Sequence, residues 1–142
     1  MQRFAPAVLV AAFVLAPSCI VSRVSTWERV TGRSWELVAI EGEALLPGSH
    51  ITLRLDDPTQ LFGESGVNRY FGSYEQIGRV GFRAGQVAST RMAGSRERME
   101  QENRYLELLK RANEIRYRKT DEGATLELIE DGSRLLTFVP SR

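Results

Sequence analysis

Short stretches of alternating apolar and polar residues, separated by turn residues, occupy most of the chain. Residues 51–55, Ile-Thr-Leu-Arg-Leu, have a period of two, which is typical of a half-buried strand. Near the C-terminus the segments 115–118, 124–128 and 134–139 follow the same pattern, and the Asp-Gly pair at 131–132 is a strong hairpin signal. Strands joined by short turns, with a single helix inserted late, predict an α+β fold.

The one strong helical stretch runs over residues 96–112. Ser95 is a suitable N-cap, and acidic residues near the start and basic residues near the end suit the helix dipole. Apolar side chains recur at helical spacing, so we expect one packed helix: Met99, Tyr105, Leu106, Leu108 and Leu109.

The length and composition limit the number of domains and the kinds of partner that the chain can bind. The chain has 142 residues, enough for one ordinary domain, with 42% hydrophobic and 26% charged residues and a formal net charge of +1. A nucleic-acid-binding protein needs a clear basic excess, so no nucleic-acid partner is expected.

The first residues are typical of a targeting segment. Arg3 precedes an apolar run at 7–15, which is too short to span a bilayer comfortably, and Ala-Pro-Ser-Cys follows at 16–19. We predict a signal peptide at 1–18 and a lipidated Cys19 that anchors the protein to a membrane, with a plain secretory signal as the alternative. Either way the protein is expected to leave the cytoplasm. With lipidation, residues 19–30 are the lipidated Cys and a tether, and the protein is anchored in the cell envelope, facing the periplasm.

Few residues of this chain are of the types that carry out catalysis or bind a metal ion. His50 lies in a predicted turn with nothing nearby to mark a nucleophile, and Asp56-Asp57 before a proline reads as a turn cap. With one Cys and one His in the chain, a zinc site is not expected, and no phosphate-binding glycine motif occurs. We therefore predict no catalytic residue, no metal and no cofactor.

Two short segments are more distinctive than the rest. Residues 66–74 read Gly-Val-Asn-Arg-Tyr-Phe-Gly-Ser-Tyr, and residues 90–94 read Thr-Arg-Met-Ala-Gly. This pairing resembles the META-domain family of HslJ-like bacterial envelope proteins, whose signature is roughly Gly-Cys-Asn-Arg-Tyr-Phe-Gly-Ser-Tyr followed by Thr-Arg-Met-Ala-Cys. The resemblance covers about residues 31–140. It implies a curled antiparallel β-sheet, a partly open barrel, with the helix packed on it. It implies no specific catalytic activity.

The chain departs from that signature at Val67 and Gly94, where many members have Cys. Both cysteines are missing together, which fits their being a pair in relatives. The domain is therefore expected to hold its fold without an internal disulfide, which typically contributes about 2–4 kcal/mol.

Two interpretations of residues 68–71 remain open. Asn68, Arg69, Tyr70 and Phe71 form a candidate loop for a partner or ligand, because Arg, Tyr and Phe are favoured at recognition sites. The architectural interpretation, which we prefer, has Asn68 bonding nearby backbone and the aromatic rings filling the end of the barrel.

Arg91 is expected to be a structural clamp. It follows a strand that leads directly into the helix, and Glu102 lies on the apolar side of that helix, where an unpaired carboxylate would be costly. We predict a bidentate Arg91–Glu102 ion pair, with Glu100 as the alternative partner and an anion site at Arg91 as the alternative role.

The predicted function follows from the resemblance and the missing chemistry. We expect a non-enzymatic envelope protein that binds a partner protein or a small apolar ligand in a cleft. The alternative is an envelope hydrolase acting on wall or lipid material. One core is expected to hold the domain: Trp35, Leu53, Leu55, Phe71, Met92, Leu106, Leu109, Leu126, Leu128 and Phe138.

Overall fold

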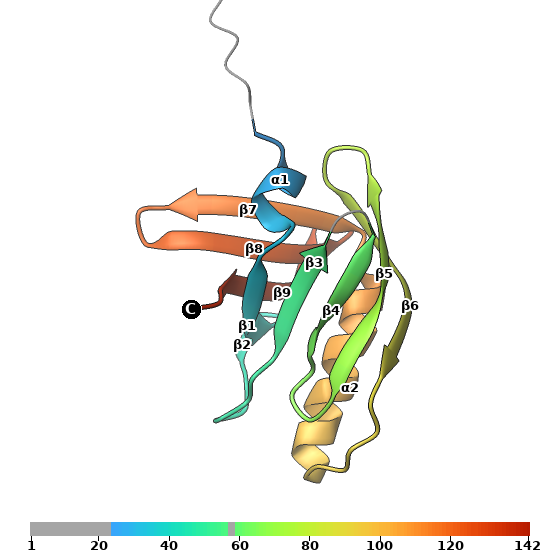
Figure 1. Ribbon diagram of the computed structural model, residues 1–142. Coiled ribbons are helices and arrows are strands. Elements are labelled where there is room, and N and C mark those ends of the chain that lie inside the picture. Colours follow the sequence, from blue (N-terminus) through green and yellow to red (C-terminus); the bar gives the residue numbers. More distant parts are fainter. Residues whose placement is uncertain (1–23, 57–58) are drawn as a thin grey trace, which may run out of the picture.

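The computed structural model describes residues 24–56 and 59–142, in which nine strands and two helices are arranged around one core (Figure 1). The predicted signal peptide at 1–18 and Cys19 lie outside these residues. The elements are α1 (Thr26–Val30), β1 (Ser34–Ile40), β2 (Glu43–Ala44), β3 (Thr52–Asp56), β4 (Gln60–Glu64), β5 (Arg69–Ile77), β6 (Gly81–Ser89), α2 (Arg96–Arg111), β7 (Glu114–Thr120), β8 (Gly123–Glu130) and β9 (Ser133–Pro140).

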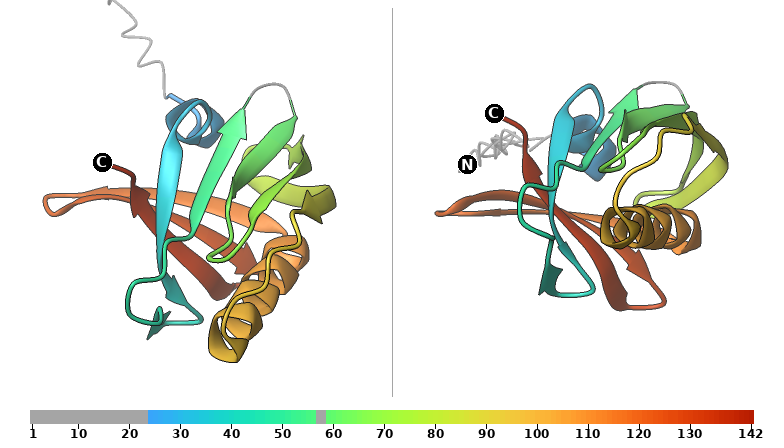
Figure 2. Two further views of the ribbon diagram at one scale, coloured as in Figure 1. Left: turned by 60° about the horizontal axis from the view of Figure 1, so that its bottom comes forward. Right: turned by 90° about the horizontal axis from the view of Figure 1, so that it is seen from below.

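The strands form one antiparallel sheet that curls into a ring. Their order is β2-β1-β3-β4-β5-β6-β7-β8-β9, and β9 also pairs with β1. The weakest junction is between β6 and β7, which pair only at Gly81 and Glu114. Helix α2 packs against β6 and β9 beside this junction (Figure 2). The predicted α+β class, with a curled antiparallel sheet and one long packed helix, is confirmed.

The core forms where the inward faces of the strands meet α2. Because side chains alternate along a strand, every second residue of a half-buried strand enters this core. Seven of the predicted core residues are at most 1% exposed: Trp35, Leu53, Leu55, Leu109, Leu126, Leu128 and Phe138.

Two predicted core residues lie outside the core, and a third packs only against its edge. Phe71 is 60% exposed because its neighbour Tyr70 takes the inward position of β5 and is only 1% exposed. Met92, also 60% exposed, lies beyond the end of β6, where no strand alternation applies. Leu106 is only half-buried, because the buried side of α2 is centred on Tyr105 and Leu109.

The expected tether differs from the structure at residues 26–30, which form α1. Ser25 caps this helix with a capping box: Glu28 N donates to the Ser25 hydroxyl, and Ser25 N donates to the Glu28 carboxylate. Trp27 and Val30 are buried in the core, and Trp27 stacks on Tyr74 with ring centroids 6.0 Å apart. The folded domain therefore begins before residue 31.

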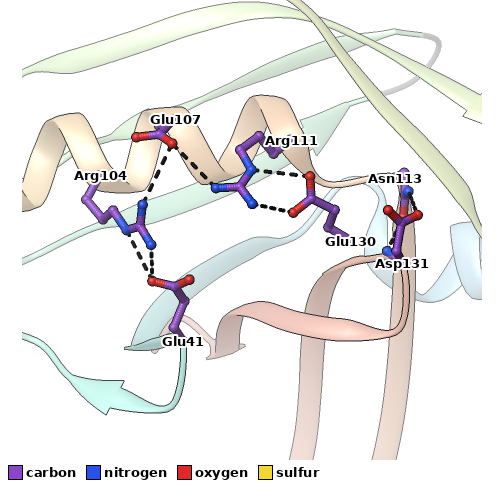
Figure 3. A network of polar contacts seen from close by, with 7 residues as sticks. All are labelled: Glu41, Arg104, Glu107, Arg111, Asn113, Glu130 and Asp131. Carbon is purple, nitrogen blue, oxygen red and sulfur yellow. Dashed lines mark hydrogen bonds and ion pairs between the residues drawn. The ribbon is translucent and has the colours of Figure 1, made fainter.

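Helix α2 starts and ends as predicted. The Ser95 hydroxyl accepts from Arg98 N at 3.4 Å, and the helix runs from Arg96 to Arg111. Its outer face makes ion pairs with the turn after β1 and with the end of β8, Arg104 with Glu41 and Arg111 with Glu130 (Figure 3). Such exposed pairs contribute at most about 1 kcal/mol each, so packing rather than charge holds the helix in place.

Candidate functional site

The two signature segments lie side by side at the start of β5 and the end of β6. Arg69 N donates to the Thr90 hydroxyl at 3.1 Å, and Thr90 N donates to the Arg69 carbonyl at 2.9 Å. Strand pairing continues from there through Tyr70–Ser89 and Phe71–Ala88. Segments that are about twenty residues apart in the sequence thus make one surface, and α2 passes behind it.

Glu102 of α2 is the centre of this arrangement. It is 3% exposed, and its Oε2 accepts hydrogen bonds from the Ser65 hydroxyl (2.8 Å), Val67 N (3.1 Å) and Asn68 N (2.8 Å). Its Oε1 accepts from Asn68 Nδ2 at 2.7 Å. Burial alone would raise the pKa of Glu102, but these four hydrogen bonds outweigh burial and lower the pKa below its usual value.

Asn68 joins the two segments to this carboxylate. Its side-chain oxygen accepts from the Thr90 hydroxyl at 2.9 Å and from Met92 N at 2.6 Å, while Nδ2 also donates to the Met92 carbonyl at 3.3 Å. A side chain that presents both two donors and an acceptor is needed here, and the amide of Asn provides them. The contacts support the architectural interpretation of Asn68.

Tyr70 is also architectural. Its hydroxyl lies 2.6 Å from that of Tyr105 and donates to the Thr52 carbonyl at 2.7 Å. Burial raises the pKa of both phenols above the usual value, so both hydroxyls are protonated at neutral pH. The pair therefore ties β5 to β3 and α2.

The expected ion pair between Arg91 and Glu102 is not formed. Arg91 is exposed, and within the described part of the chain it has no hydrogen bond or ion pair. The alternative partner, Glu100, instead binds Arg96 at 2.8 Å. Glu102 does clamp the helix to the sheet, but backbone and side-chain amides at residues 67–68 supply the donors that Arg91 was expected to supply.

The remaining two residues of the candidate loop point outward. Phe71 is 60% exposed and pairs across the strands with Phe62, which is 37% exposed. The Arg54 guanidinium lies 5.8 Å from the centre of the Phe62 ring, and the Arg69 side chain is 82% exposed. We call these four residues, Arg54, Phe62, Arg69 and Phe71, the outer aromatic face.

A shallow groove of about 370 Å³ lies where the end of β6 passes α2. Thr90, Arg91 and Met92 line it together with Asn68 and Glu102, whose polar atoms are already bonded to one another. The groove therefore has a floor of polar groups that are bonded to one another, and Arg91 at its side has no bonding partner among the described residues.

The other sequence candidates lie away from this groove. The exposed His50 ring lies between the carboxylates of Glu36 (3.5 Å) and Glu64 (3.6 Å), and Asp56 binds Arg54 at 2.9 Å. Asp57 is outside the described residues. Among residues 24–56 and 59–142, no three His, Cys, Asp or Glu side chains are placed to share a metal ion. Neither of the two helices described is both long and apolar enough to cross a membrane.

Known proteins resemble this chain in sequence pattern and fold. The sequence model of the META domain matches residues 28–142. An NMR structure of a protein from Burkholderia xenovorans matches with a TM-score of 0.66 and 26% sequence identity, over 99% of both chains. A second NMR structure, at 19% identity, has a TM-score of 0.58 over 82% of this chain and 95% of that chain, which shows similarity of fold alone. No curated protein matches the sequence.

Proposed function

The chain belongs to the META-domain family, and we propose that it is a lipid-anchored, non-enzymatic protein of the bacterial cell envelope that binds a partner protein. The outer aromatic face is the proposed contact surface. Cys19 is the proposed site of lipidation.

The observation that carries this proposal is the exposure of Phe71 beside Phe62. A single exposed apolar side chain is ordinary, but two aromatic rings on neighbouring strands, flanked by Arg54 and Arg69, make a continuous patch. Aromatic and Arg side chains are enriched where protein interfaces gain most of their binding free energy. Arg91, which has no partner among the described residues, lies beyond Thr90 and adds a further cation.

A partner protein fits better than a small apolar ligand held inside the ring. The ring is filled by large side chains that are at most 1% exposed, namely Trp35, Tyr70, Phe82, Tyr105 and Phe138. A ligand would have to displace this packing. The grooves on the molecule are shallow and lie on its surface, where a second protein can cover them.

The arrangement of polar groups supports a binding rather than a catalytic role. The buried polar side chains of the signature segments bond to one another, and Tyr70 and Tyr105 are held as neutral hydroxyls. Nothing in this cluster favours the alternative of an envelope hydrolase.

The contact surface is tested with a photo-crosslinking amino acid placed at Phe62 or Phe71 in cells that make the protein. We expect both positions to crosslink to the same envelope protein, while Val38, which is 42% exposed on β1, does not. That protein is then purified, and Phe71→Ala is expected to weaken its binding at least about tenfold, since a central aromatic contact contributes more than about 1.4 kcal/mol. Equal crosslinking from Val38, or unchanged affinity of Phe71→Ala, would reject the surface.

The anchor is tested separately. Protein from the membrane fraction is expected to begin at Cys19 and to carry the mass of acyl chains, and Cys19→Ser is expected to release it from the membrane. A mature protein that still begins at Met1, or a Cys19→Ser variant with unchanged membrane association, would contradict lipidation.

A further inference from the structure

One end of the molecule carries apolar side chains that its fold leaves exposed. Val24 precedes α1 and is 50% exposed, while Ile77, the last residue of β5, and Val80, in the turn between β5 and β6, are 42% and 41% exposed. Figure 1 shows α1 and this turn at the same end of the molecule, with the start of α2 at the opposite end.

The two parts of this end are in contact. Trp27 of α1 donates its indole N–H to the Gly78 carbonyl in the turn at 3.3 Å, and Trp27 stacks on Tyr74 of β5. A groove of about 620 Å³ runs between them, lined by Val24, Trp27 and Val80 with the exposed cation Arg79 at its edge. We call Val24, Ile77, Arg79 and Val80 the apolar tip.

The proposed anchor at Cys19 points to a membrane as the surface nearest the apolar tip. Only residues 20–23 separate Cys19 from Val24. An extended chain spans at most about 3.6 Å per residue, so a lipid on Cys19 holds Val24 within about 18 Å of the membrane. Such an anchor would keep the end of the domain that carries α1 close to the lipid headgroups.

We propose that the apolar tip rests in the surface of the bilayer, with Ile77 and Val80 inserted among the headgroups and Arg79 toward anionic lipid; this rests on the proposed anchor at Cys19. The exposed Val and Ile side chains gain from leaving water at the interface, and a cation is attracted to an anionic leaflet. Three side chains alone bind weakly, but the anchor makes the contact intramolecular and so raises its effective concentration.

The test supplies the anchor chemically. Cys19 is the only Cys in the chain, so the mature protein of residues 19–142 can be coupled through it to a maleimide phospholipid in vesicles of phosphatidylethanolamine and phosphatidylglycerol. Hydrogen exchange measured by mass spectrometry is then compared with that of the same protein capped by N-ethylmaleimide in solution. Because the linkage is made in vitro, the result does not depend on whether cells lipidate Cys19, so failure of the natural anchor and failure of the tip contact are distinguished.

Amides of α1 and of residues 76–82 are expected to exchange several-fold more slowly on the vesicles, while the turn at 131–132 does not change. The double variant Ile77→Glu/Val80→Glu is expected to lose this protection, and the matched Val38→Glu variant to keep it. Unchanged exchange in the core strand β8 checks that each variant is folded. Equal exchange with and without the vesicle, protection that survives the double variant, or protection centred on the outer aromatic face would overturn the proposal.

Discussion

Replacement of Glu102 by Gln is expected to lower the free energy of unfolding by about 3 kcal/mol at pH 7, because hydrogen bonds to a buried charged group contribute about 1.5–3 kcal/mol each and an unmet buried donor adds its own cost. Oε2 accepts from three donors and Oε1 from a fourth, so either orientation of the Gln amide turns its NH₂ group toward a donor. Asn68 cannot flip to compensate, since its oxygen already accepts from Thr90 and Met92.

The effect of this substitution should depend on pH. The pKa of Glu102 is lower in the folded protein than in the unfolded chain, where a Glu titrates near about 4.3. The ionised carboxylate therefore contributes its stabilisation fully above that value, and the contribution is lost as the pH falls through the folded-state pKa. Urea unfolding at several pH values should show the difference between the wild type and Glu102→Gln shrinking below about pH 4.

Glu107 supplies the control on the same helix. Its carboxylate is 56% exposed, and its ion pairs within the described part of the chain are with Arg104 and Arg111 at the surface. Glu107→Gln is expected to change the stability by less than about 1 kcal/mol at any pH. A Glu102→Gln variant as stable as Glu107→Gln would mean that the carboxylate is not the centre of the cluster.

Introducing cysteines at Val67 and Gly94 is expected to create a disulfide that stabilises the oxidised protein by about 3 kcal/mol. A Cβ placed on Gly94 would lie 3.6 Å from the Val67 Cβ, within the range of about 3.5–4.5 Å that disulfides require. The same Cβ would lie 2.7 Å from Val67 Cγ2, so the native Gly makes room for the native Val. The two positions at which the family resemblance implies a Cys pair are thus adjacent in this fold.

Urea unfolding with and without reductant measures this effect, in a Cys19→Ser background that prevents mispairing. The double variant should bind no thiol reagent when oxidised, and its extra stability should disappear on reduction. The single variant Gly94→Ala is the control, and it should be less stable than the wild type because the added methyl group meets Val67. Free thiols after oxidation in the folded double variant would show that the two positions are not held together.

The parts of the fold that follow a repeated pattern were predictable. Alternation identified the strands that carry Leu53 and Leu126, the Ser95 cap gave the start of α2, and the resemblance of residues 66–74 to the META-domain family is confirmed. The error concerned which side of a helix faces the core. An error of part of a turn replaced Tyr105 by Leu106 at the centre of the buried helix face.

The sequence allowed us to predict which residues belong to the candidate site, but not which groups they bind. Glu102 was recognised as a carboxylate in need of a donor, and the usual choice for a carboxylate is an Arg. Two of the four actual donors are backbone N–H groups, at Val67 and Asn68, which every residue except Pro has and which no residue type reveals. The division of the segment into inward Asn68 and Tyr70 and outward Arg69 and Phe71 needed the strand register, which the sequence does not specify by itself.

The pairing of β1 with β9 sets the order in which the domain can be completed. Trp35 pairs with Pro140, so the strand that closes the ring leaves the ribosome after all the other strands described. Until it arrives, β1 lacks one of its neighbours and the chain holds an open sheet edge. A chain threaded through an export channel from its N-terminus would therefore stay unfinished during its passage, and long-range closure of this kind is slow. For the protein proposed here, folding would be completed only on the far side of the membrane, after its anchor has already reached the lipid.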